Sequence, residues 1–492
     1  MNAPWSTIPD LVDDAALRFG DREAIVDGDL RWTFAEYRDQ IHAASRALMA
    51  HGIGAGDRIA VWAPNVAEWA VAALGAHCAG AVLVPINTRF RGREAAELLD
   101  RTLARVLFTV TDFLDADYVA MLADIGGGAG LDEIVVLRGT VSDRCTSWAD
   151  FLEVGNTVDD GNRAARSAAV GGDDLCHLMF TSGTTGSPKG AMLRHSAICR
   201  AFLAWSEVIG LEAGDRYLVV NPFFHAFGLN SGILACLMKG VTLVPHPVFD
   251  VPAVMRRVGE ERITMLPGPP AIYQTILNHP DLDEFDLSSL RLAVTGAATI
   301  PVQMIHAMRD RLGFEKVVTG YGLTEASGIA TMCRHDDDPA LIAGTSGRAI
   351  DDVEVRVVTP DGAECPAGQP GEVVVRGYNV MVGYLDDPDQ TAEAIDAEGW
   401  LHTGDIGVMD ADGYLDITDR VKDMFINGGF NVYPAEVERL MLAHPEVGQV
   451  AVVGIPDDRL GEVGMASVSY THLRAHETLR YRVWRGVGGK KR

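Results

Sequence analysis

The chain has 492 residues, of which 48% are apolar and 22% are charged, and its formal net charge at pH 7 is -26. This length and composition are typical of a soluble protein with two or more domains. The excess of negative charge argues against nucleic acid and anionic membranes as partners.

The cysteines and the apolar runs predict the compartment. The seven cysteines are scattered and form no CxxC pair, which disfavours a zinc site or a disulfide framework and fits a reducing cytoplasm. The first residues carry acids and no basic stretch before an apolar core, so we expect no signal peptide. No apolar run reaches the ~18 residues that span a bilayer, and we predict no transmembrane segment. A homo-oligomer is left open.

Short apolar runs separated by helical patterns occupy most of the chain. The runs at residues 60–62, 81–85, 135–137 and 317–318 read as buried strands, and residues 66–78 read as a helix. Strands that alternate with helices predict parallel sheets covered by helices on both faces. The predicted fold class is therefore α/β, with two sheets of parallel type in a large N-terminal domain.

The pattern changes after residue 345. Residues 353–357 and 372–376 read as strands between Gly, Pro and Asp turns, which predicts a small β-barrel-like subdomain over about 345–420. A helix at 434–442 and a strand at 450–454 then begin an α+β unit. We predict an N-terminal domain over 1–420 and a partial C-terminal domain over 421–467.

The last segment differs from the rest in charge. Residues 468–492 contain seven Lys or Arg residues and a single acid, which can indicate a basic interaction tail. Residues 468–478 also resemble a translated sequencing adapter, and no clear pattern follows them. We favour the second interpretation, in which 468–492 is not native and the natural sequence departs near Ala466 or Ser467.

A loop rich in glycine and hydroxyl groups follows the apolar strand at residues 178–180. Backbone amides and hydroxyls of such loops can surround phosphate oxygens, and a lysine adds a point charge. The Lys does not directly follow a Gly, so the loop is not the Walker type. A plain surface loop is the alternative on composition alone. The candidate residues are Thr181, Ser182, Gly183, Thr184, Thr185, Gly186 and Lys189.

This loop is similar to the phosphate loop of the adenylate-forming (acyl-CoA synthetase) superfamily, and further motifs follow in that family's order. Residues 321–325 resemble its adenine and magnesium motif, 400–405 its ribose motif and 419–423 its hinge. The resemblance covers about residues 8 to 466. It implies an ATP-dependent acid–thiol ligase that forms acyl-CoA through an acyl-adenylate, with AMP and pyrophosphate released. The implied partners are a carboxylic acid, ATP, coenzyme A and Mg²⁺.

The resemblance also assigns roles to single residues. Glu325 would hold Mg²⁺ with a hard carboxylate oxygen, with Thr324 beside it. Tyr321 would stack on adenine, and Asp405 would accept hydrogen bonds from the ribose hydroxyls. Each has a structural alternative: a surface glutamate, a core tyrosine, and a turn or helix-capping aspartate. Gly320 and Gly322 flank Tyr321 in the same motif.

The resemblance also implies which residues lie near the nucleotide and which lie near the coenzyme A thiol. Arg420 would contact the ribose or the α-phosphate, or else form only a surface ion pair. Small residues after the strand at 292–294 would leave room for the base and the acyl group, or would only make a tight turn. Lys422 aligns with the hinge, and two glycines would lie near the pantetheine tunnel. These small residues are Gly296, Ala297, Ala298, Gly428 and Gly429.

Residues 221–228 resemble the family's motif that lines the acyl pocket. His225 would sit beside the carboxylate or the pyrophosphate, although a histidine among aromatic residues is more often packed in a core. Trp400 could gate the site or belong to a core. The predicted pocket residues are His225, Phe227, Ser231, Gly268, Tyr273 and Ser327.

Several strings in the middle of the chain resemble the actinobacterial CoA ligases of steroid catabolism. Those enzymes activate an indane-dione propanoate, which implies a wide and mostly apolar pocket. A medium-chain or aryl acyl-CoA ligase is the alternative. The late lysine of the family's C-terminal domain has no equivalent here, and we do not assign its role to Lys490 or Lys491. We therefore expect poor adenylation by this polypeptide, and an ATP-binding protein without turnover is the alternative from another class.

Overall fold

The computed structural model describes residues 3–181, 188–296, 300–420, 425–427, 430–432, 434–442, 444, 447–457, 461–470 and 482–485. The predicted apolar runs become central strands of two sheets. In the first sheet, every residue of β4 (Val82–Pro85) and β5 (Val106–Val110) is buried. Strands buried on both faces need helices on both sides, which the alternating sequence supplies.

The first sheet has eight strands in the order β18-β9-β8-β4-β3-β5-β6-β7. Its interior is parallel, whereas β9 pairs antiparallel with both β8 and β18. The other bounds are β3 (Arg58–Trp62), β6 (Glu133–Arg138), β7 (Thr146–Ser147), β8 (Leu175–Thr181), β9 (Lys189–Arg194) and β18 (Gly383–Tyr384). Its helices include α2 (Phe34–Ala50), α3 (Ala67–Cys78), α4 (Gly92–Thr102), α5 (Tyr118–Ala123), α6 (Trp148–Val154) and α7 (Asp160–Ala168).

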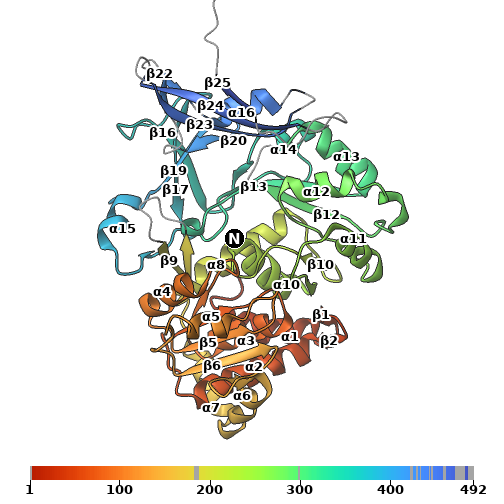
Figure 1. Ribbon diagram of the computed structural model, residues 1–492, viewed down its shortest axis with the longest axis vertical. Coiled ribbons are helices and arrows are strands. Elements are labelled where there is room, and N and C mark those ends of the chain that lie inside the picture. Colours follow the sequence, from red (N-terminus) through yellow and green to blue (C-terminus); the bar gives the residue numbers. More distant parts are fainter. Residues whose placement is uncertain are drawn as a thin grey trace, which may run out of the picture.

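The second sheet consists of two four-stranded parts joined through Met265, which bridges Tyr217 and Leu292. The strands are β1 (Glu23–Asp27), β2 (Leu30–Thr33), β10 (Arg216–Val219), β11 (Thr242–Pro245), β12 (Leu292–Gly296), β13 (Lys316–Tyr321), β14 (Thr331–Met332) and β15 (Arg348–Ala349). The helices α8 (His195–Val208), α11 (Val251–Glu260), α12 (Pro270–Leu277) and α13 (Val302–Leu312) lie near it (Figure 1).

Two smaller units complete the chain. The strands β16 (Val353–Val358), β17 (Pro370–Gly377), β19 (Leu401–Met409) and β20 (Leu415–Arg420) form an antiparallel sheet. Beyond it lie β21 (Phe425–Asn427), β22 (Phe430–Val432), α16 (Pro434–Leu442), β23 (Val447–Asp457), β24 (Gly461–Tyr470) and β25 (Arg482–Arg485). This last unit lies at the top of Figure 1, at the opposite end from β5 and β6.

Short elements connect these parts. The remaining α-helices are α1 (Ile8–Phe19), α9 (Ala226–Gly228), α10 (Ala235–Lys239), α14 (Pro339–Gly344) and α15 (Pro388–Ala394). A π-helix, η2, covers Leu229–Leu234. The 3-10 turns are η1 (Gly155–Thr157), η3 (Leu282–Glu284) and η4 (Thr324–Ala326).

The structure confirms the α/β class, the predicted strands and helices, the small β-sheet and the α+β unit that follows it. Both large sheets combine the expected parallel strand pairs with antiparallel pairs. Strand β24 runs through Tyr470 and therefore crosses the predicted junction at Ser467. The domain limits and the non-native tail stay predictions.

Candidate functional site

The loop predicted to bind phosphate is bounded by two antiparallel strands, β8 and β9. Their ladder ends with Thr181 opposite Lys189, so the strands hold the two ends of the loop side by side. The residues between them, Ser182, Gly183, Thr184, Thr185 and Gly186, lie outside the described residues. Their phosphate contacts stay predictions, whereas Thr181 and Lys189, which bound the loop, lie opposite each other.

Glu325 lies on the 3-10 turn η4, which Thr324 begins. Thr181 Oγ1 donates a hydrogen bond of 3.1 Å to Glu325 Oε1 although the two residues are far apart in sequence. The hydroxyl of Tyr384 donates to the same oxygen at 3.0 Å. Lys189 Nζ lies 4.9 Å from the centre of the Tyr384 ring. The predicted lysine, threonine and glutamate are therefore neighbours around one tyrosine.

The predicted ribose and adenine residues also meet. Tyr321 ends β13, and its hydroxyl donates a 2.6 Å hydrogen bond to Asp405 Oδ2 on β19. Asp405 is 5% exposed, and its backbone pairs with that of Arg420 on β20. Tyr321 is four residues from Glu325 in the sequence, so one short segment carries a residue of each pair of contacts. The side chain of Arg420 lies outside the part of the chain that the structure describes.

Close backbone contacts explain two predicted glycines, Gly296 and Gly322. Gly296 pairs with Gly320 across β12 and β13, and a Cβ at Gly296 would lie 2.8 Å from the carbonyl oxygen of Gly320. A Cβ at Gly322 would lie 2.3 Å from the carbonyl oxygen of Gly328. A side chain at Gly296 would push β12 away from β13, and one at Gly322 would displace the backbone at Gly328 and Ile329, just after η4. These contacts account for the glycines without any ligand.

His225 caps α9, and its Nδ1 accepts a 3.2 Å hydrogen bond from the backbone N–H of Phe227. Desolvation by the surrounding protein lowers the pKa of His225 below its ordinary value, although the residue remains exposed. The ring is therefore neutral at pH 7, and because Nδ1 is an acceptor, the proton belongs on Nε2. Such a ring can donate one hydrogen bond to an anionic oxygen.

The other predicted pocket residues are mostly engaged inside the protein. Tyr273 donates to the carbonyl oxygens of Leu266 and Val294 at 2.9 and 3.2 Å. The hydroxyl of Ser327 donates to Asn379 O at 2.7 Å. Their roles as pocket walls stay predictions. The others are Ser231, which donates to Phe227 O; Phe227, whose ring contacts Trp205 edge-on; and Gly268, where a Cβ would crowd Ile272.

Trp400 belongs to a small core rather than to this group. It is 6% exposed and packs with Val358 and Val374. The guanidinium groups of Arg356 and Arg376 lie 4.6 and 4.4 Å from its ring centre. Trp400 therefore lies in a core, which was the alternative to a gating role.

The donor set at Glu325 suits Mg²⁺ only together with a substrate. Among the described residues, no cluster of three His, Cys, Asp or Glu side chains could hold a metal ion. Mg²⁺ is commonly held by one or two carboxylates plus phosphate oxygens and water, so a single glutamate next to a triphosphate site fits it.

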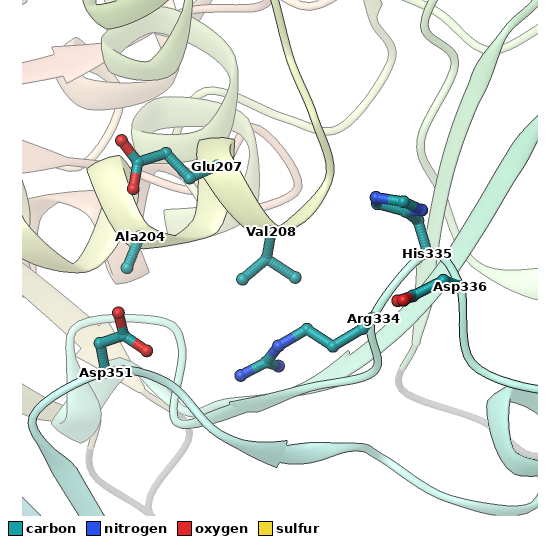
Figure 2. Close-up of a pocket in the computed structure, with 7 residues that line it drawn as sticks. All are labelled: Ala204, Glu207, Val208, Arg334, His335, Asp336 and Asp351. Carbon is teal, nitrogen blue, oxygen red and sulfur yellow. The ribbon is translucent and has the colours of Figure 1, made fainter.

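Two open hollows in the structure are lined by residues other than the group around Glu325. One, of about 310 Å³, lies between α8 and the segment after β14 (Figure 2), and another measures about 340 Å³. Arg334 lines both, and its guanidinium donates to Met332 O and Ala349 O at 2.6 and 3.2 Å. Figure 2 shows mixed charges around the first hollow. Its lining residues are Ala204, Glu207, Val208, Arg334, His335, Asp336 and Asp351.

Five further predicted residues lie outside the described residues: Ala297, Ala298, Lys422, Gly428 and Gly429. The neighbour of Glu325 that sequence reasoning missed is Tyr384. Its only sequence signal is its place in one of the strings that resemble steroid-catabolic ligases. In the described part of the chain, no helix has the length and apolar composition needed to cross a membrane.

Comparisons with known proteins agree over nearly the whole chain. A family model for "AMP-binding enzyme" matches residues 12–385, and one for "AMP-binding enzyme C-terminal domain" matches residues 436–487. A 3-(7a-methyl-1,5-dioxo-octahydro-inden-4-yl)propanoyl:CoA ligase of Rhodococcus jostii (strain RHA1) is 48% identical over 467 residues, which cover 94% of this chain and 88% of that protein.

A ligase of the same name from Mycobacterium tuberculosis is also 48% identical, over 462 residues, with coverage of 94% and 88%. Among solved structures, the anthranilate CoA ligase AuaEII in complex with anthranoyl-AMP superposes with a TM-score of 0.86 at 26% identity. That match covers 96% of this chain and 88% of the other.

Proposed function

Since this chain belongs to the AMP-binding enzyme family, we propose that its acid is a bicyclic, dione-bearing propanoate of steroid origin. The chain is an acyl-CoA ligase. It uses ATP and coenzyme A to convert a carboxylic acid into an acyl-CoA through an acyl-adenylate. The single observation that carries the proposed acid is 48% identity, over 94% of this chain, to two ligases named for that acid.

The first step joins two anions. A carboxylate oxygen of the acid attacks the α-phosphorus, a carbon–oxygen–phosphorus linkage forms, and pyrophosphate leaves. No side chain needs to form a covalent bond, so the protein's task is to orient the reactants and offset their charge. We propose that Lys189 contacts the phosphates, that Glu325 binds the metal, and that Asp405 holds the ribose. Mg²⁺, when bound, neutralises phosphate charge.

The second step is attack of the coenzyme A thiol on the acyl carbonyl carbon, after which AMP leaves with the bonding electrons. For the first step, we propose that the neutral imidazole of His225 donates from Nε2 to the substrate carboxylate or the leaving pyrophosphate. Its lowered pKa supports this role, because a neutral ring keeps one N–H donor and would add no positive charge beside Mg²⁺.

We also propose that the protein works in the cytoplasm. All seven cysteines are free thiols in the structure, and five of them are buried. Free cysteines in this number are typical of a reducing compartment.

The test is thioester formation across a panel of acids. The panel contains the indane-dione propanoate, straight-chain acids of medium length and hydroxycinnamate-type acids, with AMP release measured in parallel. We expect kcat/KM for the indane-dione propanoate to exceed the others by at least about tenfold, because shape and polar-group recognition commonly discriminate by 10-fold or more. A preference for straight-chain or aryl acids would overturn the proposed substrate. ATP binding without AMP release would favour a binding protein instead.

A further inference from the structure

Tyr384 stands between the two charged groups of the candidate ATP site. Its ring lies beneath the ammonium group of Lys189, with 4.9 Å between Nζ and the ring centre. Its hydroxyl donates a 3.0 Å hydrogen bond to Glu325 Oε1. One side chain thus contacts the cation through its π face and the anion through its polar tip.

Short strand pairing fixes the backbone of Tyr384. Strand β18 pairs with β9, placing Tyr384 opposite Ala191, two residues from Lys189. Just before it, the backbone N–H of Met381 donates to the carbonyl oxygen of Glu325 at 2.8 Å. The same short segment therefore holds the backbones that carry the lysine and the glutamate, and Tyr384 itself is only 8% exposed.

The hydroxyl of Tyr384 donates its hydrogen bond to Glu325 Oε1. Thr181 donates to the same oxygen, so both hydrogen bonds fall on one side of the carboxylate.

This arrangement leaves two opposite charges close together but unpaired. No hydrogen bond to Glu325 Oε2 and no ion pair between Lys189 and Glu325 occur among the described residues. A lysine and a glutamate that lie near each other attract, although solvent weakens the attraction at partly exposed positions. If they paired, each would neutralise the charge that a metal–triphosphate complex needs.

We propose that Tyr384 is a positioning residue that holds Lys189 and Glu325 apart and turns Glu325 so that Oε2 faces the metal. The proposal rests on the proposed ATP and Mg²⁺ site and adds a residue to it. The proposal implies that the tyrosine hydroxyl strengthens ATP binding only when Mg²⁺ is present. Its ring, which positions Lys189, should strengthen ATP binding with or without Mg²⁺.

Two variants of the full chain separate these effects. Tyr384→Phe removes only the hydroxyl, and Tyr384→Leu removes the ring as well. The affinity for ATP is measured by calorimetry once with Mg²⁺ and once with EDTA. In Tyr384→Phe we expect Kd with Mg²⁺ to rise on the order of tenfold, the value of a hydrogen bond to a charged group. Kd in EDTA should change by less than about twofold, and in Tyr384→Leu it should rise as well.

Tyr378→Phe is the matched control, because Tyr378 lies on the same segment and its ring packs 3.8 Å from the Arg200 guanidinium. It should leave both affinities unchanged. Equal weakening of ATP binding with and without Mg²⁺ in Tyr384→Phe, or values equal to those of the control, would overturn the proposal. If the unaltered chain bound no ATP, the proposed site itself would fail. Should Tyr384→Leu not fold, the Phe variant alone decides.

Discussion

The group around Glu325 and the histidines beneath α1 are both built from titratable side chains that distant segments bring together. His77, His177 and His195 come from α3, β8 and α8, and their rings pack with centroids 5.1 and 5.5 Å apart. All three are fully buried, and burial lowers the pKa of each. Glu325 and Lys189 instead remain partly exposed and receive directed polar contacts.

The difference shows that residue type alone does not indicate chemistry. The histidines face one another and apolar neighbours, so they contribute to packing. The group around Glu325 keeps polar atoms near solvent, where a ligand can reach them. Variants in the first group should change stability, and variants in the second should change turnover.

The largest expected effect is that of Glu325→Gln. It removes the only charge assigned to the metal, and we expect acyl-adenylate formation to fall by about 10²–10³-fold, as for loss of one preorganised charged contact. The melting temperature should shift by less than about 2 °C. Pyrophosphate exchange measures the rate, and the exposed Glu364→Gln is the control. An unchanged exchange rate would contradict the assignment.

Gly322→Ala tests the backbone beneath the same group. The added Cβ would lie 2.3 Å from Gly328 O and 2.5 Å from Ile329 Cα, so backbone atoms must move. We expect the free energy of unfolding to fall by about 3 kcal/mol. Urea denaturation measures it. Gly344→Ala is the control, since a Cβ there meets nothing within 4 Å. Equal stability of the two variants would show that the contact is relieved at little cost.

His195→Gln tests the buried histidines through pH. Burial lowers the pKa of His195 to about 3 from an ordinary value of 6.5, so the unfolded chain takes up a proton first. The free energy of unfolding is therefore unaffected by this group above pH 6.5, and it decreases as the pH falls from 6.5 toward 3. Between pH 6.5 and 5 this one group should cost about 2 kcal/mol.

Urea midpoints at the two pH values are the measurement. The His195→Gln variant should lose about 2 kcal/mol less than the unaltered chain, while a glutamine oxygen can still accept from Ile8 N. Identical pH profiles for the two proteins would place the His195 pKa near its ordinary value.

The smallest expected effect is that of Tyr321→Phe. The variant loses the 2.6 Å hydrogen bond to Asp405 and keeps the ring. We expect KM for ATP to rise about fivefold, since one side-chain hydrogen bond is worth about 1 kcal/mol. Tyr414→Phe removes an equally short bond, to Asp337, away from this group. If both variants raise KM alike, the Tyr321 contact has no special role.

The strands could be predicted from sequence because buried apolar runs are local signals. The antiparallel pairing of β9 with β8 and β18 could not, because strand direction depends on partners far apart in the chain. Local patterns such as residues 353–357 and 372–376 did indicate the smaller antiparallel sheet.

The candidate site was predictable where a motif is contiguous, as at Thr181, Lys189, Tyr321 and Glu325. Tyr384 was not, because its function depends on a contact across 59 residues to Glu325. The buried hydroxyls of Tyr273 and Ser327 show the converse limit. Sequence similarity placed them near a pocket, but only coordinates reveal that carbonyl oxygens already accept from them.

Tyr321 packs against both the large core and the small cluster formed by Val357, Val373 and Leu415. Because its hydroxyl also donates a hydrogen bond to Asp405, Tyr321 links the large domain to the antiparallel sheet. If the unit after β20 rotated, the Tyr321–Asp405 contact would keep Asp405 in place relative to the large domain. A nucleotide bound at Asp405 would then stay with the large domain during that rotation.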